Sequence, residues 1–296
     1  MRTTATLLTI TSLVAGPVAA QQTEVVLLGT GMPRPNPAAS APATAIVRGD
    51  MVLLFDAGPG VMRQLRAANL PIDGVTALFL THLHSDHTLG YPDLLLTSWV
   101  MGRTRRTPVF GPTGTRRMTD LLYEAWATDI RVRTEGLERE PAGGEQVMVQ
   151  EIEEGVVWEG DGVTVTAFRV PHGDFPNSFG YRIETPDRVI VISGDTGPSA
   201  AVERMAAGAD VLVHEVYSST HLKPEDRPGG ELWPAYMRAF HTSDEEVGQL
   251  AARAQPGLVL LTHIILMGGS NADLVTGVRR GGYTGPLEVG RDLGRY

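Results

Sequence analysis

The stretch Thr-His-Leu-His-Ser-Asp-His at residues 81–87 follows directly on an apolar run and decides how the rest of the chain is interpreted. It places three imidazoles and one carboxylate within six residues, at the expected end of a buried strand. Alternate side chains of extended backbone share a face, so His82 and His84 can reach one cation while a turn carries Asp86 and His87 to a second. The stretch therefore predicts a site for two metal ions.

The ligand types narrow the choice of metal. The chain of 296 residues has no cysteine, so every metal ligand must be His, Asp or Glu, and a Cys nucleophile is excluded. Imidazole nitrogen with carboxylate oxygen suits zinc, and it also accepts manganese, iron or cobalt. We expect two Zn²⁺ ions, with Mn²⁺ or Fe²⁺ as alternatives.

Composition indicates one globular domain with an acidic surface. Apolar residues make up 42% and charged residues 20% of the chain, and the net charge is -9. An acidic body repels a polyanion, so we expect a small-molecule substrate and no nucleic acid. A local arginine cluster is interpreted as a solvated edge in preference to an RNA patch; it comprises Arg103, Arg105, Arg106, Arg116 and Arg117.

The first twenty residues have the pattern of an export signal. A short positive start, an apolar stretch at 7–15 and the small residues Val18-Ala19-Ala20 before Gln21 are typical of a signal peptide. We predict a signal peptide at 1–20, a single domain at 21–296, and a periplasmic or secreted protein without membrane contact after cleavage. An apolar N-terminal strand or a membrane anchor is the alternative.

The remaining chain has strand-like and helix-like patterns in two halves, which indicates an α/β fold. Strands are expected near 24–30, 43–48, 51–56, 76–81, 108–110, 146–153, 163–170, 179–185, 188–193, 211–216 and 258–263. Helices are expected near 60–69, 88–101, 115–127, 199–208, 243–254 and 271–280.

Three more potential ligands stand at strand ends, namely His172, Asp195 and His263. Each alone has an ordinary explanation, because an Asp after a strand often caps a turn. Asp56, which ends an earlier strand, is interpreted as a buried carboxylate that orients the 81–87 loop. Alternation along 211–216 puts His214 and Glu215 on opposite faces, so only one of them should face the site.

The chain resembles the metallo-β-lactamase superfamily, whose signature is T-H-x-H-x-D-H, and more narrowly its ribonuclease Z branch with arylsulfatase and β-lactamase relatives. The resemblance rests on the 81–87 stretch and on further motifs that span nearly all of the chain after residue 20. They are Val25 to Gly31, Phe55 to Gly58, Phe179 to Ile183, Ser193 to Thr196 and Leu261 to His263. The resemblance implies an αββα sandwich of two mixed sheets with flanking helices.

The same resemblance implies the residue roles. His82, His84 and His172 would hold one zinc, Asp86, His87 and His263 the other, and Asp195 would bridge them. The expected nucleophile is a hydroxide shared by the two ions. The predicted catalytic residues are Asp86, Glu215 and His241, with His241 as general acid and Glu215 as its orienting partner; the alternative is that the last two only hydrogen-bond to ligands.

The sequence is least informative about the substrate. Ribonuclease Z carries a long arm between its third His motif and its Gly-Asp-Thr motif, and His172 and Asp195 are too close in sequence to hold one. We therefore expect an exported hydrolase of a small phosphodiester or aryl sulfate, with β-lactam hydrolysis as the alternative. A tRNA 3' processing endonuclease and a non-catalytic metal-binding protein are less favoured, and a homodimer is allowed. The segment 217–241 is interpreted as a loop whose aromatics either line the pocket or pack on the core.

Overall fold

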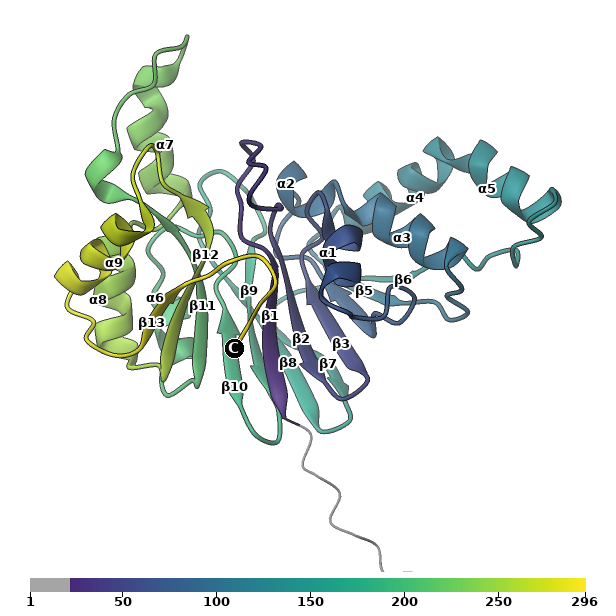
Figure 1. Ribbon diagram of the computed structural model, residues 1–296, viewed down its shortest axis with the longest axis horizontal. Helices are drawn as coiled ribbons and strands as arrows, with labels where there is room; N and C mark the ends of the chain where they lie inside the picture. The colour runs from purple at the N-terminus through teal and green to yellow at the C-terminus, as the bar shows by residue number, and fades with distance from the viewer. Residues whose placement is uncertain (1–21) are drawn as a thin grey trace, which may run out of the picture.

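The computed structural model describes residues 22–296, and the predicted signal peptide at 1–20 lies outside them. Two seven-stranded sheets pack face to face, and helices cover their outer surfaces (Figure 1). This arrangement confirms the αββα sandwich that the sequence predicted. In the part of the chain that the structure describes, no helix combines the length and the apolar character needed to cross a bilayer.

The first sheet has the strand order β14-β1-β2-β3-β4-β5-β6. Its strands are β1 (Thr23–Gly29), β2 (Ala43–Arg48), β3 (Met51–Phe55), β4 (Ala77–Phe79), β5 (Pro108–Gly111), β6 (Met148–Glu151) and β14 (Gly294–Arg295). Pairing is antiparallel from β14 to β3 and parallel from β3 to β6.

The second sheet repeats this plan in the order β13-β12-β11-β10-β9-β8-β7. Its strands are β7 (Gly155–Gly160), β8 (Val163–Arg169), β9 (Phe179–Glu184), β10 (Val189–Ile192), β11 (Val211–Tyr217), β12 (Leu258–Ile265) and β13 (Leu287–Val289). Pairing is antiparallel from β7 to β10 and parallel from β10 to β13. The segments that follow β4, β8 and β10, together with the end of β12, carry the predicted ligands.

Side-chain alternation explains why the inner strands are apolar on both faces. In β1, Val25 and Leu27 point into the core between the sheets, whereas Val26 and Leu28 pack under the helices. A third cluster fills the space between the second sheet and its own helices. Burial on both faces leaves little tolerance for register slips, which fixes where each strand ends and therefore where each ligand emerges.

The helices lie outside the sheets. They are α1 (Val61–Ala67), α2 (Ser85–Thr88), α3 (Tyr91–Val100), α4 (Thr115–Ala125), α5 (Ala127–Glu135), α6 (Ala200–Ala206), α7 (Trp233–Phe240), α8 (Asp244–Ala254) and α9 (Asn271–Arg280), with the short 3₁₀ turns η1 (Ser219–His221) and η2 (Gly230–Leu232). Helices α4 and α5 project from one end of the molecule, and α7 projects from the other (Figure 1).

Several elements differ from the sequence prediction. The segment 217–241 was expected to be a loop, but it contains α7, whose Pro234 is tolerated because it stands in the first turn. Strand β7 and helix α5 were missed; β7 is a largely exposed edge strand, and α5 has no buried residue. Arg103 is buried and donates to the carbonyl oxygens of Gly144 and Glu145, so it is not part of a solvated edge.

Candidate metal centre

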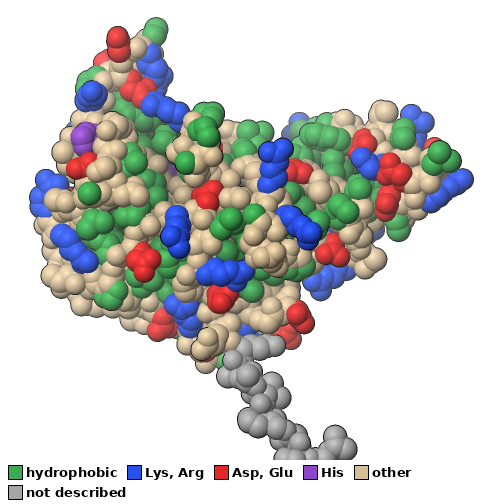
Figure 2. All heavy atoms as spheres, in the orientation of Figure 1, with side chains coloured by type: hydrophobic (Ala, Val, Ile, Leu, Met, Phe, Trp, Pro, Cys, Tyr) green, Lys and Arg blue, Asp and Glu red, His purple; other side chains and the backbone are tan. Residues whose placement is uncertain are grey.

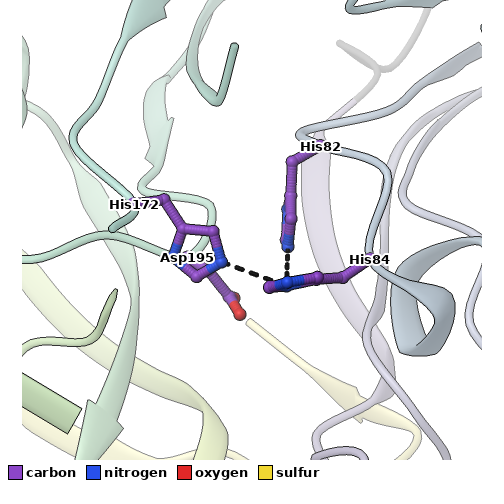
Figure 3. Close-up of side chains that lie close together, drawn as sticks. All are labelled: His82, His84, His172 and Asp195. Carbon is purple, nitrogen blue, oxygen red and sulfur yellow. Dashed lines mark hydrogen bonds between the residues drawn. The ribbon is translucent and has the colours of Figure 1, made fainter. Parts of the chain in front are cut away.

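Three imidazoles converge at one edge of the sandwich, where loops that follow strands of both sheets carry the ligands. His82 and His84 come from the loop after β4, and His172 comes from the loop after β8. The Nε2 atoms of His82 and His172 lie 2.9 and 3.1 Å from Nδ1 of His84 (Figure 3). Three ring nitrogens at such spacing form a cluster that a cation can occupy.

Asp195 completes this first group and also faces a second one. Its ligand oxygen lies within 4.8 Å of the ligand atoms of His82, His84 and His172. Its Oδ2 atom also lies 3.4 Å from Nε2 of His87 and 3.2 Å from Nε2 of His263. Asp195 is therefore placed between two sets of ligands.

The second set consists of Asp86, His87 and His263, whose ligand atoms also lie within 4.8 Å of one another. Oδ2 of Asp86 lies 3.6 Å from Nε2 of His87 and 3.3 Å from Nε2 of His263. All three side chains are buried. The structure thus brings together all seven residues that the sequence suggested as metal ligands.

A hydrogen-bond network built on Asp56 fixes the rings of His82 and His87. Asp56 accepts from Nδ1 of His87 at 2.7 Å and from the backbone N–H and hydroxyl of Thr81. Because the Thr81 hydroxyl donates to Asp56, its oxygen accepts from Nδ1 of His82 at 2.9 Å. Both rings therefore hold a proton on Nδ1 and direct Nε2 at the cluster, as metal-binding imidazoles do.

His172 is oriented in the same manner by a different partner. Its Nδ1 donates to the carbonyl oxygen of Phe240 at 2.7 Å, which leaves Nε2 as the acceptor that faces His84. Nε2 of His87 is buried beside Asp86 and Asp195 without a hydrogen-bond partner among the described residues. Imidazole nitrogens that converge with carboxylates, one of them unpartnered, fit a divalent cation.

The electrostatics differ between the two sets of histidines. Burial lowers the pKa of His82 and His84, and it lowers the pKa of His172 to about 4. Burial acts in the same direction on His87 and His263, but nearby carboxylates outweigh it. Asp195 and Asp56 raise the pKa of His87 well above its ordinary value, and Asp195 with Asp86 raises the pKa of His263 to about 9.

The carboxylates of the centre stay ionised. Burial raises the pKa of Asp195, but the opposing charges of His263 and His87 hold it well below its usual range. Burial likewise raises the pKa of Asp86, and the hydrogen bond from His263 and the charge of His87 lower it overall. Both carboxylates are therefore available as anionic ligands at neutral pH.

The backbone at His263 is strained in order to present its ring. The pairing of β11 with β12 shifts between Glu215–Thr262 and Val216–Ile264, which leaves His263 as the extra residue of a bulge. Its φ of 43° lies in the left-handed region that L side chains rarely adopt. Such strain is found where function requires a specific side-chain direction.

Glu215 and His241 form a pair next to the metal ligands. Oε2 of Glu215 lies 3.2 Å from Nδ1 of His241, and Oε1 accepts from the backbone N–H groups of Thr196 and Thr242 at 3.1 Å. Nδ1 of His241 lies 3.9 Å from Oδ2 of Asp195. Glu215 is the member of the 214–215 pair that reaches the site, whereas His214 donates to the Glu215 carbonyl oxygen.

Two aromatic residues lie near the centre: Phe240, one of the aromatics of segment 217–241 that were expected to line the pocket or pack on the core, and Phe175, which was not assigned a role from the sequence. The Phe175 ring lies 4.3 Å from the His84 ring, and the Phe240 ring lies 5.1 Å from that of His172. Gly173 makes room for Phe240: its φ is +50°, and a Cβ there would lie 2.1 Å from the Phe240 ring. The only trace of this contact in the sequence is the glycine after His172. The reason for that glycine is the Phe240 ring, which lies 67 residues further along the chain and could not be paired with it from the sequence.

The chain matches known proteins over most of its length. Residues 52–264 match the model of the β-lactamase superfamily domain. A Ribonuclease Z of Mycobacterium sp. (strain KMS) is 35% identical over 92% of this chain and 95% of its own length. A Ribonuclease Z of Mycobacterium bovis (strain BCG / Pasteur 1173P2) is 32% identical over 92% of this chain and 97% of its own.

Solved structures share the fold. The metallo-β-lactamase fold protein YhfI from Bacillus subtilis matches with a TM-score of 0.70 at 19% identity, over 93% of this chain and 98% of its own. The short form of human tRNase Z matches with a TM-score of 0.65 at 21% identity, over 92% of this chain and 98% of its own.

These relatives correct two expectations. The preference for a small phosphodiester, an aryl sulfate or a β-lactam, and the expectation of no nucleic-acid partner, are both wrong, because the similar proteins are named Ribonuclease Z. The missing arm was a weak argument: the alignment covers 95% of the Mycobacterium relative in 280 residues, which leaves no space there for a long arm that this chain lacks. Net charge was also a weak guide, because a local site can bind RNA on an acidic protein.

The matched domain, the identity to full-length relatives and the cluster of His and Asp ligands lead to one conclusion: this chain is a metal-dependent hydrolase that belongs to the metallo-β-lactamase superfamily, in its ribonuclease Z branch.

Proposed function

We propose that this protein is an endoribonuclease of the ribonuclease Z type, which hydrolyses a phosphodiester at the 3' end of a tRNA precursor with the help of two zinc ions. The observation that carries the proposal is the 35% identity, over 92% of the chain, to a relative named Ribonuclease Z. The two sets of ligands and the adjacent Glu215–His241 pair supply the chemical groups that this reaction needs.

The chain's own residues would hold the ions in two half-sites. The first half-site is His82, His84 and His172, and the second is Asp86, His87 and His263, with Asp195 shared between them. Imidazole nitrogens and carboxylate oxygens without thiolates favour zinc, and they also allow manganese or iron. When bound, two such cations lower the pKa of a water and offset the negative charge of the phosphodiester.

The protein residues around the half-sites have separate tasks. Asp86 remains ionised, so it can accept a hydrogen bond from the attacking water as well as serve as a ligand. The Asp56 and Thr81 network keeps two ligand rings in the tautomer that binds a cation. Burial of six of the seven ligands, all except the half-buried His84, excludes competing solvent and strengthens their interaction with charge.

His241 is the proposed general acid. The leaving oxygen of an RNA strand is a poor leaving group, because it departs as a strongly basic alkoxide unless it receives a proton. Glu215 lies within hydrogen-bond range of Nδ1 of His241 and is itself held by two backbone N–H groups, so the Nε2 atom of the ring is free to donate to that oxygen. In this arrangement Glu215 fixes the orientation of the His241 ring.

The test is cleavage of a tRNA precursor with a 3' extension by the zinc-loaded protein, with the product ends mapped at nucleotide resolution. The proposal predicts cleavage at one position at the 3' end of the tRNA body, which disappears with a chelator and returns with zinc. Turnover of bis(p-nitrophenyl) phosphate by the same preparation shows that the centre is loaded and active. Hydrolysis of that diester without any cleavage of the precursor would contradict the proposal.

Export stays a prediction that rests on residues 1–20 alone. Sequencing of the native protein from its N-terminus tests this prediction separately from the activity. A start near Gln21 would confirm the signal peptide, and a start at Met1 would show that the prediction is wrong.

A further inference from the structure

Three aromatic rings line one face of α7 and lead toward the metal centre. Trp233 stacks on Tyr236 with ring centroids 5.2 Å apart and an interplanar angle of 14°, and Tyr236 stacks on Phe240 at 4.3 Å and 20°. Phe240 continues the series to His84, with centroids 6.5 Å apart and planes at 23°. We call Trp233, Tyr236 and Phe240 the aromatic ladder.

The buried residue that anchors α7 is not part of the ladder. Met237 on the same helix is completely buried against Tyr217 and Ile265, and it provides the anchor. Trp233, Tyr236 and Phe240 are each only partly buried. Large aromatic side chains that stay partly exposed beside a site are available to contact a ligand.

The outer end of the ladder opens into a cleft of about 520 Å³. Trp233, Met32 and Met267 provide apolar surface, while Arg34, Lys223 and Arg227 provide positive charge. The guanidinium of Arg227 lies 5.8 Å from the Trp233 ring centroid. Glu225 pairs with both Arg34 and Arg227, and Asp226 also lines the cleft, so the cleft carries only a small excess of positive charge.

An unpaired nucleotide is the ligand that matches this combination. A base offers a flat face for stacking on the outer side of Trp233, next to Arg227, whereas Tyr236 is covered on both faces and supports Trp233 from within the ladder. The phosphate of the nucleotide offers a partner for a guanidinium or an ammonium group. We propose that the cleft and the aromatic ladder bind an unpaired nucleotide of the RNA strand close to the cleaved bond. This inference rests on the proposed function and adds a binding subsite to it.

The position of the ladder relative to the catalytic groups supports an occupant on the cleaved strand. The Tyr236 ring lies 5.9 Å from that of His241, the proposed general acid, and the Phe240 carbonyl orients the ligand His172. A strand whose phosphate lies at the metal centre would therefore pass the inner rings before it leaves the protein. Charges of both signs are interspersed on the face that Figure 2 shows. Within the cleft, Glu225 and Asp226 offset most of the positive charge, so we expect stacking to contribute a large share of the binding free energy.

The first experiment replaces rings and compares two substrates. For Trp233→Ala and Tyr236→Ala we expect the kcat/KM for the tRNA precursor, relative to that for bis(p-nitrophenyl) phosphate, to fall at least about fivefold, mainly through KM. Trp233→Phe keeps a ring and should recover most of the loss. Trp126→Ala is the matched control, because Trp126 is also partly exposed but lies on the α4–α5 arm at the other end of the molecule.

The second experiment locates the nucleotide from the substrate side. Precursors with one abasic nucleotide at each unpaired position flanking the cleaved bond are compared with wild-type protein and Trp233→Ala. At the position that contacts the ladder, loss of the base should weaken cleavage by the wild-type protein but not reduce cleavage by Trp233→Ala any further. This non-additivity would not arise if Trp233 only stabilised the fold.

The outcomes separate this inference from the proposed function. Wild-type cleavage of the precursor with unchanged substrate ratios in the ring variants would overturn the inference and leave the function in place. The inference would also be overturned if Trp126→Ala lost as much activity as Trp233→Ala, or if every abasic effect were additive. Absence of precursor cleavage by the wild-type protein would overturn both.

Discussion

The two half-sites of the metal centre contain similar ligands but have opposite protonation. In the first half-site, burial keeps the pKa of His82, His84 and His172 below the ordinary value, so their rings are neutral at pH 7. In the second, adjacent carboxylates raise the pKa of His87 and His263, so these rings bind protons when no metal is present. The neighbours of an imidazole, rather than its depth alone, decide whether it is ready to bind a cation.

The supporting contacts also differ between the half-sites. His87 donates directly to Asp56 at 2.7 Å, whereas His82 reaches the same carboxylate only through the Thr81 hydroxyl. His172 uses the Phe240 carbonyl, which carries no full charge. Removing charge near the centre should therefore disturb the second half-site more than the first.

The largest effect is expected where the half-sites share a ligand. Asp195→Ala removes the carboxylate that faces both sets, so we predict that zinc content falls below two per chain and that kcat/KM falls at least about a thousandfold. Metal analysis and kinetics on one preparation measure both quantities, with circular dichroism as the control for folding. Retention of two tightly bound zinc ions would show that Asp195 is not shared.

A smaller effect is expected from a change that spares both half-sites. His241→Ala should leave the zinc content at the wild-type level and lower cleavage of the tRNA precursor by about 10²- to 10⁴-fold, because the general acid is lost. Turnover of bis(p-nitrophenyl) phosphate should fall much less, since nitrophenolate leaves without a proton. Equal losses on the two substrates would argue against the general-acid role.

The next effect tests the difference between the half-sites directly. Asp56→Asn keeps the size of the side chain and removes its charge, so we predict about a 10- to 100-fold loss of zinc affinity, mainly at the second half-site. Thr81→Ser keeps the hydroxyl that links Asp56 to His82 and serves as the conservative control. If Asp56→Asn weakened both half-sites equally, the direct contact to His87 would not be the cause.

Much of the fold could be predicted from the sequence, because most strands are buried on both faces and appear as apolar runs. The run before residue 81 marks the end of β4 and therefore the start of the ligand loop. The edge strand β7 gave no such signal, since Val156 is 60% exposed. Helix α7 was hidden by the prolines and glycines around it, although a proline in a first turn does not prevent a helix.

The seven suspected ligands could be found because His and Asp stand at strand ends. Their geometry could not, because it depends on contacts between distant segments. The bulge that presents His263 exists only in the register between β11 and β12. The tautomer of His172 depends on a carbonyl of Phe240, and any backbone carbonyl could have supplied that contact. The substrate preference was wrong for a related reason, since net charge does not describe a local binding surface.

The most direct test of the unequal half-sites is proton release on metal binding. Metal-free protein is titrated calorimetrically with zinc at pH 7 in buffers of different ionisation enthalpy, for the wild type, His172→Ala and His263→Ala. A raised pKa means that the ring must lose its proton before it binds zinc, so His263→Ala should release about one proton fewer than the wild type, and His172→Ala should release the same number as the wild type. Equal proton release by the two variants would contradict the difference between the half-sites.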